Sequence, residues 1–131
     1  MTEQARDLWR RALRALRTAT TLVNEDPDSP ASRAYYAAFY AVSAVFALED
    51  RFFTKHRAIE AAVHRDLVKA GRWPEDLGTA FSELVRLRTM GDYGLGAHVS
   101  ADASKEAVRQ AELILQGVRQ VCPDLGRETG P

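Results

Sequence analysis

Arg88 is the residue of this chain whose position on a helix most clearly suggests chemistry. Leu77, Phe81 and Leu84 recur at intervals of four and three, which is one face of an α-helix. The same face continues to Arg88, whose guanidinium cannot lose its charge and therefore needs an anion nearby or an exit to water. Two interpretations stay open: Arg88 snorkels at the helix end and pairs with Asp92, or it faces a cleft and binds a phosphate.

A group of cationic or titratable side chains, Lys55-His56-Arg57, begins the third predicted helix. Positive charge at a helix N-terminus opposes the helix dipole, and a bound anion would relieve that cost. An exposed basic turn is the alternative. His64 follows Arg57 with six residues between them, but a single helical histidine is more typical of a surface or core position than of a catalytic one.

His98 lies in a predicted loop after Asp92 and Tyr93, in a segment with glycines at 91, 94 and 96. A loop can present a general base to a substrate, and imidazole titrates in the useful pH range. The sequence contains no Ser-His-Asp order, phosphate-binding glycine loop or cluster of metal ligands. We therefore expect neither a metal nor an organic cofactor.

Three tyrosines, Tyr35, Tyr36 and Tyr40, lie on the second predicted helix. A buried tyrosine usually finds a partner for its hydroxyl group, so we expect at least one of them to point toward Arg88. The alternative is that all three are plain core aromatics.

The first predicted helix carries a ridge of arginines at spacings of four, four and three. Its members are Arg6, Arg10, Arg14 and Arg17, with Arg11 beside them. The ridge is either a solvated helix face or a surface for phosphates or an acidic partner.

The elements that must position these residues are all helical, because no stretch alternates apolar and polar residues well enough to propose a strand. We expect helices over residues 3–24, 30–51, 55–70 and 74–90, and a fifth from Ser100 or Asp102 to Cys122. The second helix is apolar nearly all round, which indicates a central position. Three other helices should each bury a stripe: Leu8, Ala12, Leu16, Ala19 and Val23 in the first, Ile59, Val63 and Leu67 in the third, and Val108, Ala111, Leu115, Val118 and Cys122 in the fifth.

Single residues mark where these helices begin and end. Ser29 is expected to cap the second helix, with Pro30 in its first position, and Gly71 to terminate the third. Residues 91–100 are expected to form a loop. The expected domain covers residues 1–123, and residues 124–131 form a tail with little to bury that we expect to fray.

Length and composition fit one domain with a real core: the chain has 131 residues, of which 46% are hydrophobic. Lysine plus arginine equals aspartate plus glutamate, 18 each, so net charge argues neither for nor against nucleic acid. Cys122 is the only cysteine, which excludes an internal disulfide and a zinc site built on paired thiolates, and favours a reducing cytoplasm. The first residues do not resemble a signal peptide, and the longest uncharged run, Ala34 to Leu48, is shorter than the roughly 20 residues of a membrane span.

Several segments together resemble the HEPN (higher eukaryotes and prokaryotes nucleotide-binding) domain family over about residues 5 to 122. The segment 32–41, Ser-Arg-Ala-Tyr-Tyr-Ala-Ala-Phe-Tyr-Ala, is similar to the second helix of these domains. Lys55-His56 falls where one prokaryotic branch carries a lysine–histidine pair. Arg88-Thr89-Met90-Gly91-Asp92-Tyr93 resembles the Arg-x-x-x-Asp-Tyr signature of that branch, and the last helix matches in placement.

The resemblance implies an antiparallel bundle of four to five helices that forms a homodimer. In the wider family, two copies bring arginine–histidine motifs together into one composite site that cleaves RNA. Many members act as toxins beside a small nucleotidyltransferase antitoxin. The family motif is an arginine, four to six residues, then a histidine.

This chain departs from that motif, because Tyr93 stands where the histidine is expected after four intervening residues. Tyrosine, with an ordinary pKa of about 10, is a poor base at neutral pH, but it donates hydrogen bonds to phosphates and stacks on bases. His98 would be a substitute base, although its spacing from Arg88 falls outside the family range.

Three hypotheses follow. In the first, a weakly catalytic or non-catalytic HEPN module binds a nucleotide, an RNA or a nucleotidyltransferase through Arg88, Asp92 and Tyr93, with Lys55, His56, Tyr36 and Tyr40 as further ligand-binding candidates. In the second, a metal-independent ribonuclease toxin uses Arg88, assisted by Tyr93 or His98. In the third, the protein is a structural helical dimer without a ligand.

Overall fold

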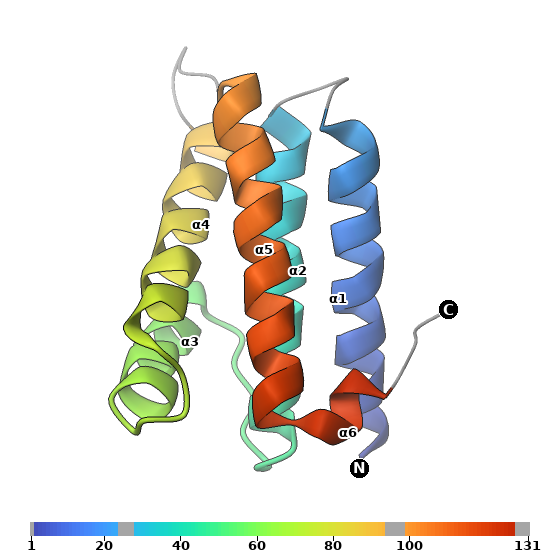
Figure 1. The fold of residues 1–131 in the computed structure, drawn as a ribbon, viewed down its shortest axis with the longest axis vertical. Helices are drawn as coiled ribbons and strands as arrows, with labels where there is room; N and C mark the ends of the chain where they lie inside the picture. The colour runs from blue at the N-terminus through green and yellow to red at the C-terminus, as the bar shows by residue number, and fades with distance from the viewer. Residues whose placement is uncertain (1, 24–27, 94–98, 128–131) are drawn as a thin grey trace.

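The computed structural model describes residues 2–23, 28–93 and 99–127, without the side chains at 28–29, 90–93 and 126. The described residues contain helices and no strand (Figure 1). This confirms the predicted all-α class. The elements in chain order are α1 (Glu3–Leu22), α2 (Asp28–Ala47), α3 (His56–Ala62), the π-helical η1 (Val63–Val68), α4 (Glu75–Tyr93), α5 (Ala101–Val121) and α6 (Pro123–Gly126).

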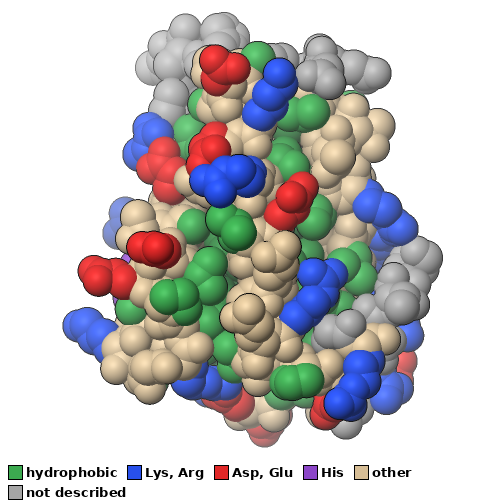
Figure 2. All heavy atoms as spheres, in the orientation of Figure 1, with side chains coloured by type: hydrophobic (Ala, Val, Ile, Leu, Met, Phe, Trp, Pro, Cys, Tyr) green, Lys and Arg blue, Asp and Glu red, His purple; other side chains and the backbone are tan. Residues whose placement is uncertain are grey.

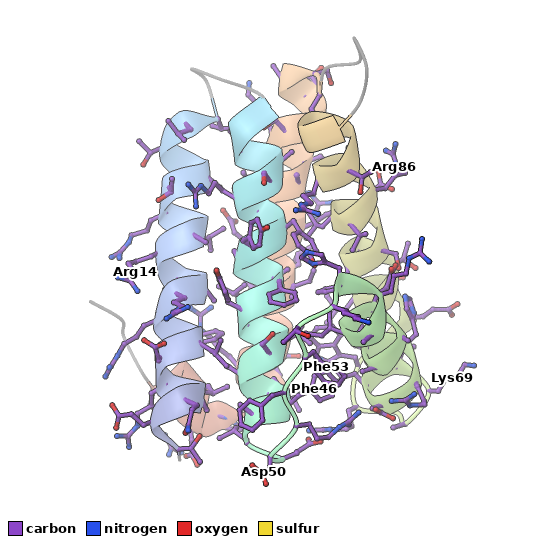
Figure 3. All side chains as sticks on the ribbon, turned by 180° about the vertical axis from the view of Figure 1, so that it is seen from behind. Arg14, Phe46, Asp50, Phe53, Lys69 and Arg86 are labelled. Carbon is purple, nitrogen blue, oxygen red and sulfur yellow. The ribbon has the colours of Figure 1, made fainter. Side chains whose placement is uncertain are left out.

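Helix α2 is central, as its all-round apolar sequence predicts. It packs against α1, α5 and α4. Small side chains allow these close approaches, since the fully buried residues of α2 include Ala34, Ala37, Ala38, Ala41 and Ala44. Figure 3 shows the opposite side of the bundle, where α1 and α4 flank α2 and no described helix covers the half of α2 nearer its start.

Helix α2 ends at Ala47 rather than near Arg51, because a turn closes its last carbonyl groups. The amide of Arg51 donates to the carbonyl of Phe46 at 2.9 Å, and the amide of Asp50 donates to that of Ala47 at 3.0 Å. Asp50 has a φ of 59°. This is the Schellman arrangement, with Asp50 in the left-handed position that glycine usually occupies. The guanidinium of Arg51 lies over the Phe46 ring at 4.8 Å and covers the turn.

The third predicted helix is interrupted. After α3 the chain widens into η1, where the amide of Lys69 donates to the carbonyl of His64, five residues earlier, at 3.0 Å. Such π-helical turns occur often at functional sites. Gly71 follows with a φ of 79°, which confirms the predicted glycine stop. The predicted inward residues Ile59, Val63 and Leu67 are fully buried.

Helix α1 is rotated relative to its predicted stripe. Of the expected residues, Ala12 and Ala19 are fully buried, whereas Leu8, Leu16 and Val23 are only partly buried. The reason is Trp9, which the prediction omitted: its ring is fully buried, and Arg119 of α5 lies over it at 5.2 Å. The largest side chain of the helix therefore determines which face packs inward.

Three further predicted ends differ from the structure. Helix α2 begins at Asp28, so Ser29 lies inside the helix and not at its cap. Helix α4 continues to Tyr93, past the predicted end at Met90. The chain also continues to pack beyond Pro123, because the short α6 buries Leu125 completely at the end of the bundle where α1 begins (Figure 1).

Helix α5 follows its prediction closely. Ser100 caps it, since its hydroxyl accepts from the amide of Ala103 at 3.0 Å. Its predicted stripe is buried except for Cys122, which is half-buried. Trp73, another residue the prediction omitted, donates from Nε1 to the carbonyl of Gly117 at 3.1 Å and ties the start of α4 to α5.

Candidate functional site

Arg88 lies where the apolar face of α4 meets α2, as the sequence pattern predicts. Phe81 and Leu84 on the same face are fully buried, and Arg88 itself is half-buried. Its guanidinium donates to the hydroxyl of Tyr36 at 3.2 Å. The guanidinium carbon is 5.8 Å from the ring centre of Tyr35 and 5.6 Å from that of Tyr36. Two aromatic rings therefore hold the cation in place at the rim of the core.

His56, the first residue of α3, joins the same two tyrosines. Its Nδ1 is hydrogen-bonded to the hydroxyl of Tyr35. Its ring centre is 5.2 Å from that of Tyr35 and 6.3 Å from that of Tyr36. Arg88 and His56 thus come from two different helices and meet on one aromatic pair, although 32 positions separate them in the sequence numbering.

The charge states of this cluster follow from burial and from Arg88. Burial raises the pKa of the Tyr35 hydroxyl more strongly than the positive charge of Arg88 lowers it, so the phenol keeps its proton. Burial, and after it the charge of Arg88, lower the pKa of His56 below its ordinary value of 6.5. At neutral pH the imidazole is therefore neutral, and Arg88 is the cation of the pair.

An aromatic surface adjoins these two residues. The rings of Tyr36 and Tyr40 are 5.9 Å apart and inclined by only 31°. Phe39 lies 5.4 Å from the His56 ring and 5.8 Å from Tyr40. All three aromatic side chains are half-buried. Half-buried rings beside a cation keep part of their surface accessible, on which a base could stack.

A second polar network joins Glu60 of α3 and His64 of η1 to Ser82 of α4. Nε2 of His64 is 2.8 Å from the hydroxyl of Ser82, and this hydroxyl donates to the carboxylate of Glu60 at 2.6 Å. Gly78 of α4 makes room for it, because a Cβ at that position would lie 3.0 Å from two atoms of the His64 ring. The order of the hydrogen bonds is not that of a catalytic triad, since the serine proton goes to the glutamate and not to the histidine.

The sequence pointed to some of these residues and not to others. Tyr36 contacts Arg88 with its ring and its hydroxyl, as expected of one tyrosine. His56 contacts the same two tyrosines as Arg88, and Tyr40 packs on Tyr36. Tyr35 had been singled out, but its bond to His56 had not been predicted. Glu60 and Ser82 were missed; the available signal was the spacing of four between His56, Glu60 and His64, which places the three on one helical face.

The structure describes the remaining predicted site residues only in part. Lys55 is exposed at the start of α3 and makes no capping hydrogen bond with its side chain. Asp92 and Tyr93 belong to the last turn of α4, so residues 91–93 are helical and not part of the predicted loop. Their side chains, and the whole of His98, lie outside the described residues.

The arginine ridge of α1 lies apart from this cluster. Arg14 and Arg17 are exposed, Arg6 and Arg10 are half-buried, and Arg11 pairs with Asp7 at 3.0 Å. Figure 3 shows Arg14 pointing outward from α1, away from α2 and α4. Arg14 and Arg17 border a shallow hollow of about 280 Å³.

Other surface features offer less chemistry. A hollow of about 510 Å³ lies between α4 and α5, on the side of the bundle shown in Figure 2, where apolar and charged side chains are mixed. Two of its charged residues already have partners, since Glu83 binds Arg86 and Arg109 binds Glu106. Among the described residues, no three side chains of histidine, cysteine, aspartate or glutamate gather as metal ligands, and no helix is long and apolar enough to cross a membrane.

Comparisons with known proteins agree with this architecture. The model of the HEPN domain family matches residues 5–121. The chain is 35% identical over 127 residues to a UPF0332 protein of Thermotoga maritima, covering 95% of this chain and 96% of that protein. It is 30% identical over 118 residues to a UPF0332 protein of Gloeobacter violaceus, covering 88% and 94% of the two chains. The chain therefore belongs to the HEPN domain family.

Proposed function

We propose that this HEPN protein binds a nucleotide or a single-stranded RNA through Arg88 and the aromatic surface beside it. One observation carries the proposal: a permanently charged guanidinium is held half-buried against Tyr35 and Tyr36, next to half-buried aromatic rings. A guanidinium matches the geometry of a phosphate group and stays charged when partly desolvated.

The aromatic surface suits the rest of such a ligand. Bases of unpaired RNA stack on tyrosine and phenylalanine rings, and each stacked base adds roughly 1–3 kcal/mol. Tyr36, which contacts the cation, and Tyr40 offer two neighbouring rings inclined by 31°. The chain has no net charge, so binding through one cation and stacking is more consistent with a short single-stranded segment than with a duplex backbone.

In this proposal the protein acts in the cytoplasm as a homodimer, paired with a small nucleotidyltransferase in a system of the toxin–antitoxin kind. The support is family membership together with the Arg-x-x-x-Asp-Tyr pattern at Arg88, Asp92 and Tyr93. Asp92, Tyr93 and Lys55 are proposed as further ligand contacts.

A metal-independent ribonuclease is the second candidate, because the structure brings an imidazole to Arg88. His56 lies on the same tyrosine pair as the arginine, although the family histidine is replaced by Tyr93. In this reading Arg88 would neutralise charge at phosphorus and an imidazole would transfer a proton, with His98 as the other histidine available.

Binding of a fluorescein-labelled single-stranded oligoribonucleotide, measured by anisotropy, tests the proposal. Loss of a hydrogen-bonded charged partner predicts a roughly 10- to 100-fold weaker affinity for Arg88→Ala. Arg86→Ala is the matched control, since Arg86 lies on the exposed side of the same helix and pairs with Glu83. Equal affinities of wild type and Arg88→Ala would refute the proposal.

The same samples separate the alternatives. Cleavage of the oligonucleotide without added metal, lost in Arg88→Ala, would favour the ribonuclease. A lower melting temperature of Arg88→Ala without any RNA or nucleotide binding by the wild type would favour the structural dimer. Sedimentation of the unlabelled protein tests the homodimer.

A further inference from the structure

We infer that Tyr35 fixes His56 in the tautomer that carries its proton on Nε2, so that His56 is a neutral hydrogen-bond donor to the phosphate that Arg88 binds and not a general base. The inference rests on the proposed function and deepens it. It names Tyr35 as a positioning residue and a phosphate group as the part of the ligand that His56 contacts.

The first step is the direction of one hydrogen bond. The side chain of Tyr35 is fully buried, and its hydroxyl is bonded to Nδ1 of His56. A buried phenol that keeps its proton needs an acceptor, and the lone pair of Nδ1 is the one at hand in the described residues. In a neutral imidazole only one ring nitrogen carries hydrogen, so accepting at Nδ1 places that hydrogen on Nε2.

The second step concerns the charges around the imidazole. Arg88 approaches from α4, Tyr35 and Tyr36 from α2, and Glu60 lies one turn along α3. If Nδ1 also carried a proton, its N–H would face the O–H of Tyr35, and two donors would oppose each other. The ring would then also be a second cation beside Arg88. Burial and Arg88 both lower the pKa of His56, in agreement with a neutral ring.

The third step is what two such donors recognise. The guanidinium of Arg88 and the imidazole of His56 contact the same two rings. Burial and, after it, the charge of Arg88 lower the pKa of His56, so the two groups are neighbours at one site. A phosphate offers several acceptor oxygens and suits both donors. A ring nitrogen that already carries hydrogen cannot take the proton of a ribose hydroxyl, so the arrangement favours binding without cleavage.

Nitrogen-15 NMR of the histidine rings reads the tautomer directly. We expect His56 at pH 7 to show a protonated Nε2 and an unprotonated Nδ1, with its signals identified by their loss in His56→Gln. In Tyr35→Phe the donor is gone, and we expect a mixture of tautomers. A proton on Nδ1 of the wild-type ring at pH 7, or an unchanged tautomer in Tyr35→Phe, would overturn the inference. If Tyr35→Phe does not fold, the wild-type spectrum alone decides.

Titration with adenosine 5′-monophosphate adds the functional readout. Loss of a neutral hydrogen bond predicts about 2- to 12-fold weaker binding by His56→Leu, whereas His56→Gln keeps a donor and should stay nearer the wild type. Equal binding by His56→Leu and wild type would overturn the role of His56 while leaving the proposed function intact. Unchanged binding by Arg88→Ala would instead refute the proposed function, whatever the tautomer of His56.

Discussion

His56 and His64 lie eight residues apart on one helical segment and differ in what surrounds them. His64 is bonded to Ser82, which in turn donates to Glu60, so this chain of hydrogen bonds ends on a carboxylate within the protein. His56 is bonded at one nitrogen to buried Tyr35, and it borders a half-buried arginine and an aromatic surface. We therefore expect the two histidines to have different roles.

The difference lies in what surrounds the polar groups: other polar side chains around His64, and aromatic rings around His56 and Arg88. A network whose donors and acceptors all have partners holds helices together and has little left to offer a ligand. A cation held at the surface by aromatic rings keeps its affinity for an anion. The Glu60–Ser82–His64 network is therefore expected to serve stability, and the Arg88 cluster to serve binding. Variants that change one property without the other can test this separation.

Gly78→Val should have the largest effect. It should lower the stability that depends on the Glu60–Ser82–His64 network and leave binding unchanged. Its Cβ would lie 2.8 Å from a methyl group of Val68 and 3.0 Å from the His64 ring, closer than packing allows. Such overpacking costs about 1–3 kcal/mol of unfolding free energy, which chemical denaturation measures. Thr79→Val, at the exposed neighbouring position, is the control. The RNA affinity of the folded variant should stay within about twofold of wild type. An unchanged free energy of unfolding would contradict the prediction and show that η1 rearranges without cost to accept the valine.

Ser82→Ala should have the next largest effect. It removes the bridge between His64 and Glu60 and leaves two half-buried polar groups without their partner, at a cost of about 1–2 kcal/mol. Urea unfolding measures this loss. Thr89→Ala is the matched control on the same helix, because its hydroxyl is exposed and bonds to its own helix backbone. A weaker RNA affinity of Ser82→Ala would contradict the separation of the two regions.

Tyr40→Leu should change binding more than stability. The leucine keeps part of the apolar contact and removes a ring on which a base can stack, which predicts a loss of about 1 kcal/mol, or roughly fivefold, in RNA affinity. Anisotropy measures the affinity, and thermal unfolding measures the stability. Tyr40→Phe keeps the ring and should bind like the wild type. Equal loss in both variants would point to the hydroxyl group instead of stacking.

The pH dependence of stability should show the smallest effect, and it belongs to His56. Because the pKa of His56 is lower in the folded protein, the unfolded chain binds more protons just below pH 6.5. The contribution of His56 to the free energy of unfolding is therefore complete above about pH 6.5. It is lost as the pH falls from there to the lowered pKa of the folded protein. Urea unfolding between pH 7.5 and 5 should show a shallower fall for His56→Gln than for wild type. Parallel curves would mean that the pKa of His56 is the same in the folded and the unfolded protein.

Local chemistry was sufficient to predict most of the helices and the position of Arg88. The apolar spacing through Phe81 and Leu84, the left-handed glycine at Gly71 and the hydroxyl cap at Ser100 depend on residues within a few positions of one another. These rules act within one or two helical turns, so they can be read along the chain. The end of α2 was misplaced because Asp50 adopts a conformation typical of glycine.

Packing between helices determined the rest. The bonds from Tyr35 to His56, from Ser82 to His64 and from Trp73 to Gly117 join residues 21, 18 and 44 positions apart. No spacing rule connects such pairs, because the rotation and depth of each helix depend on which side chains fill the core around it. The arginine at the rim of the core follows from the sequence, whereas the position of the imidazole follows from the tertiary contact between His56, at the start of α3, and Tyr35 of α2.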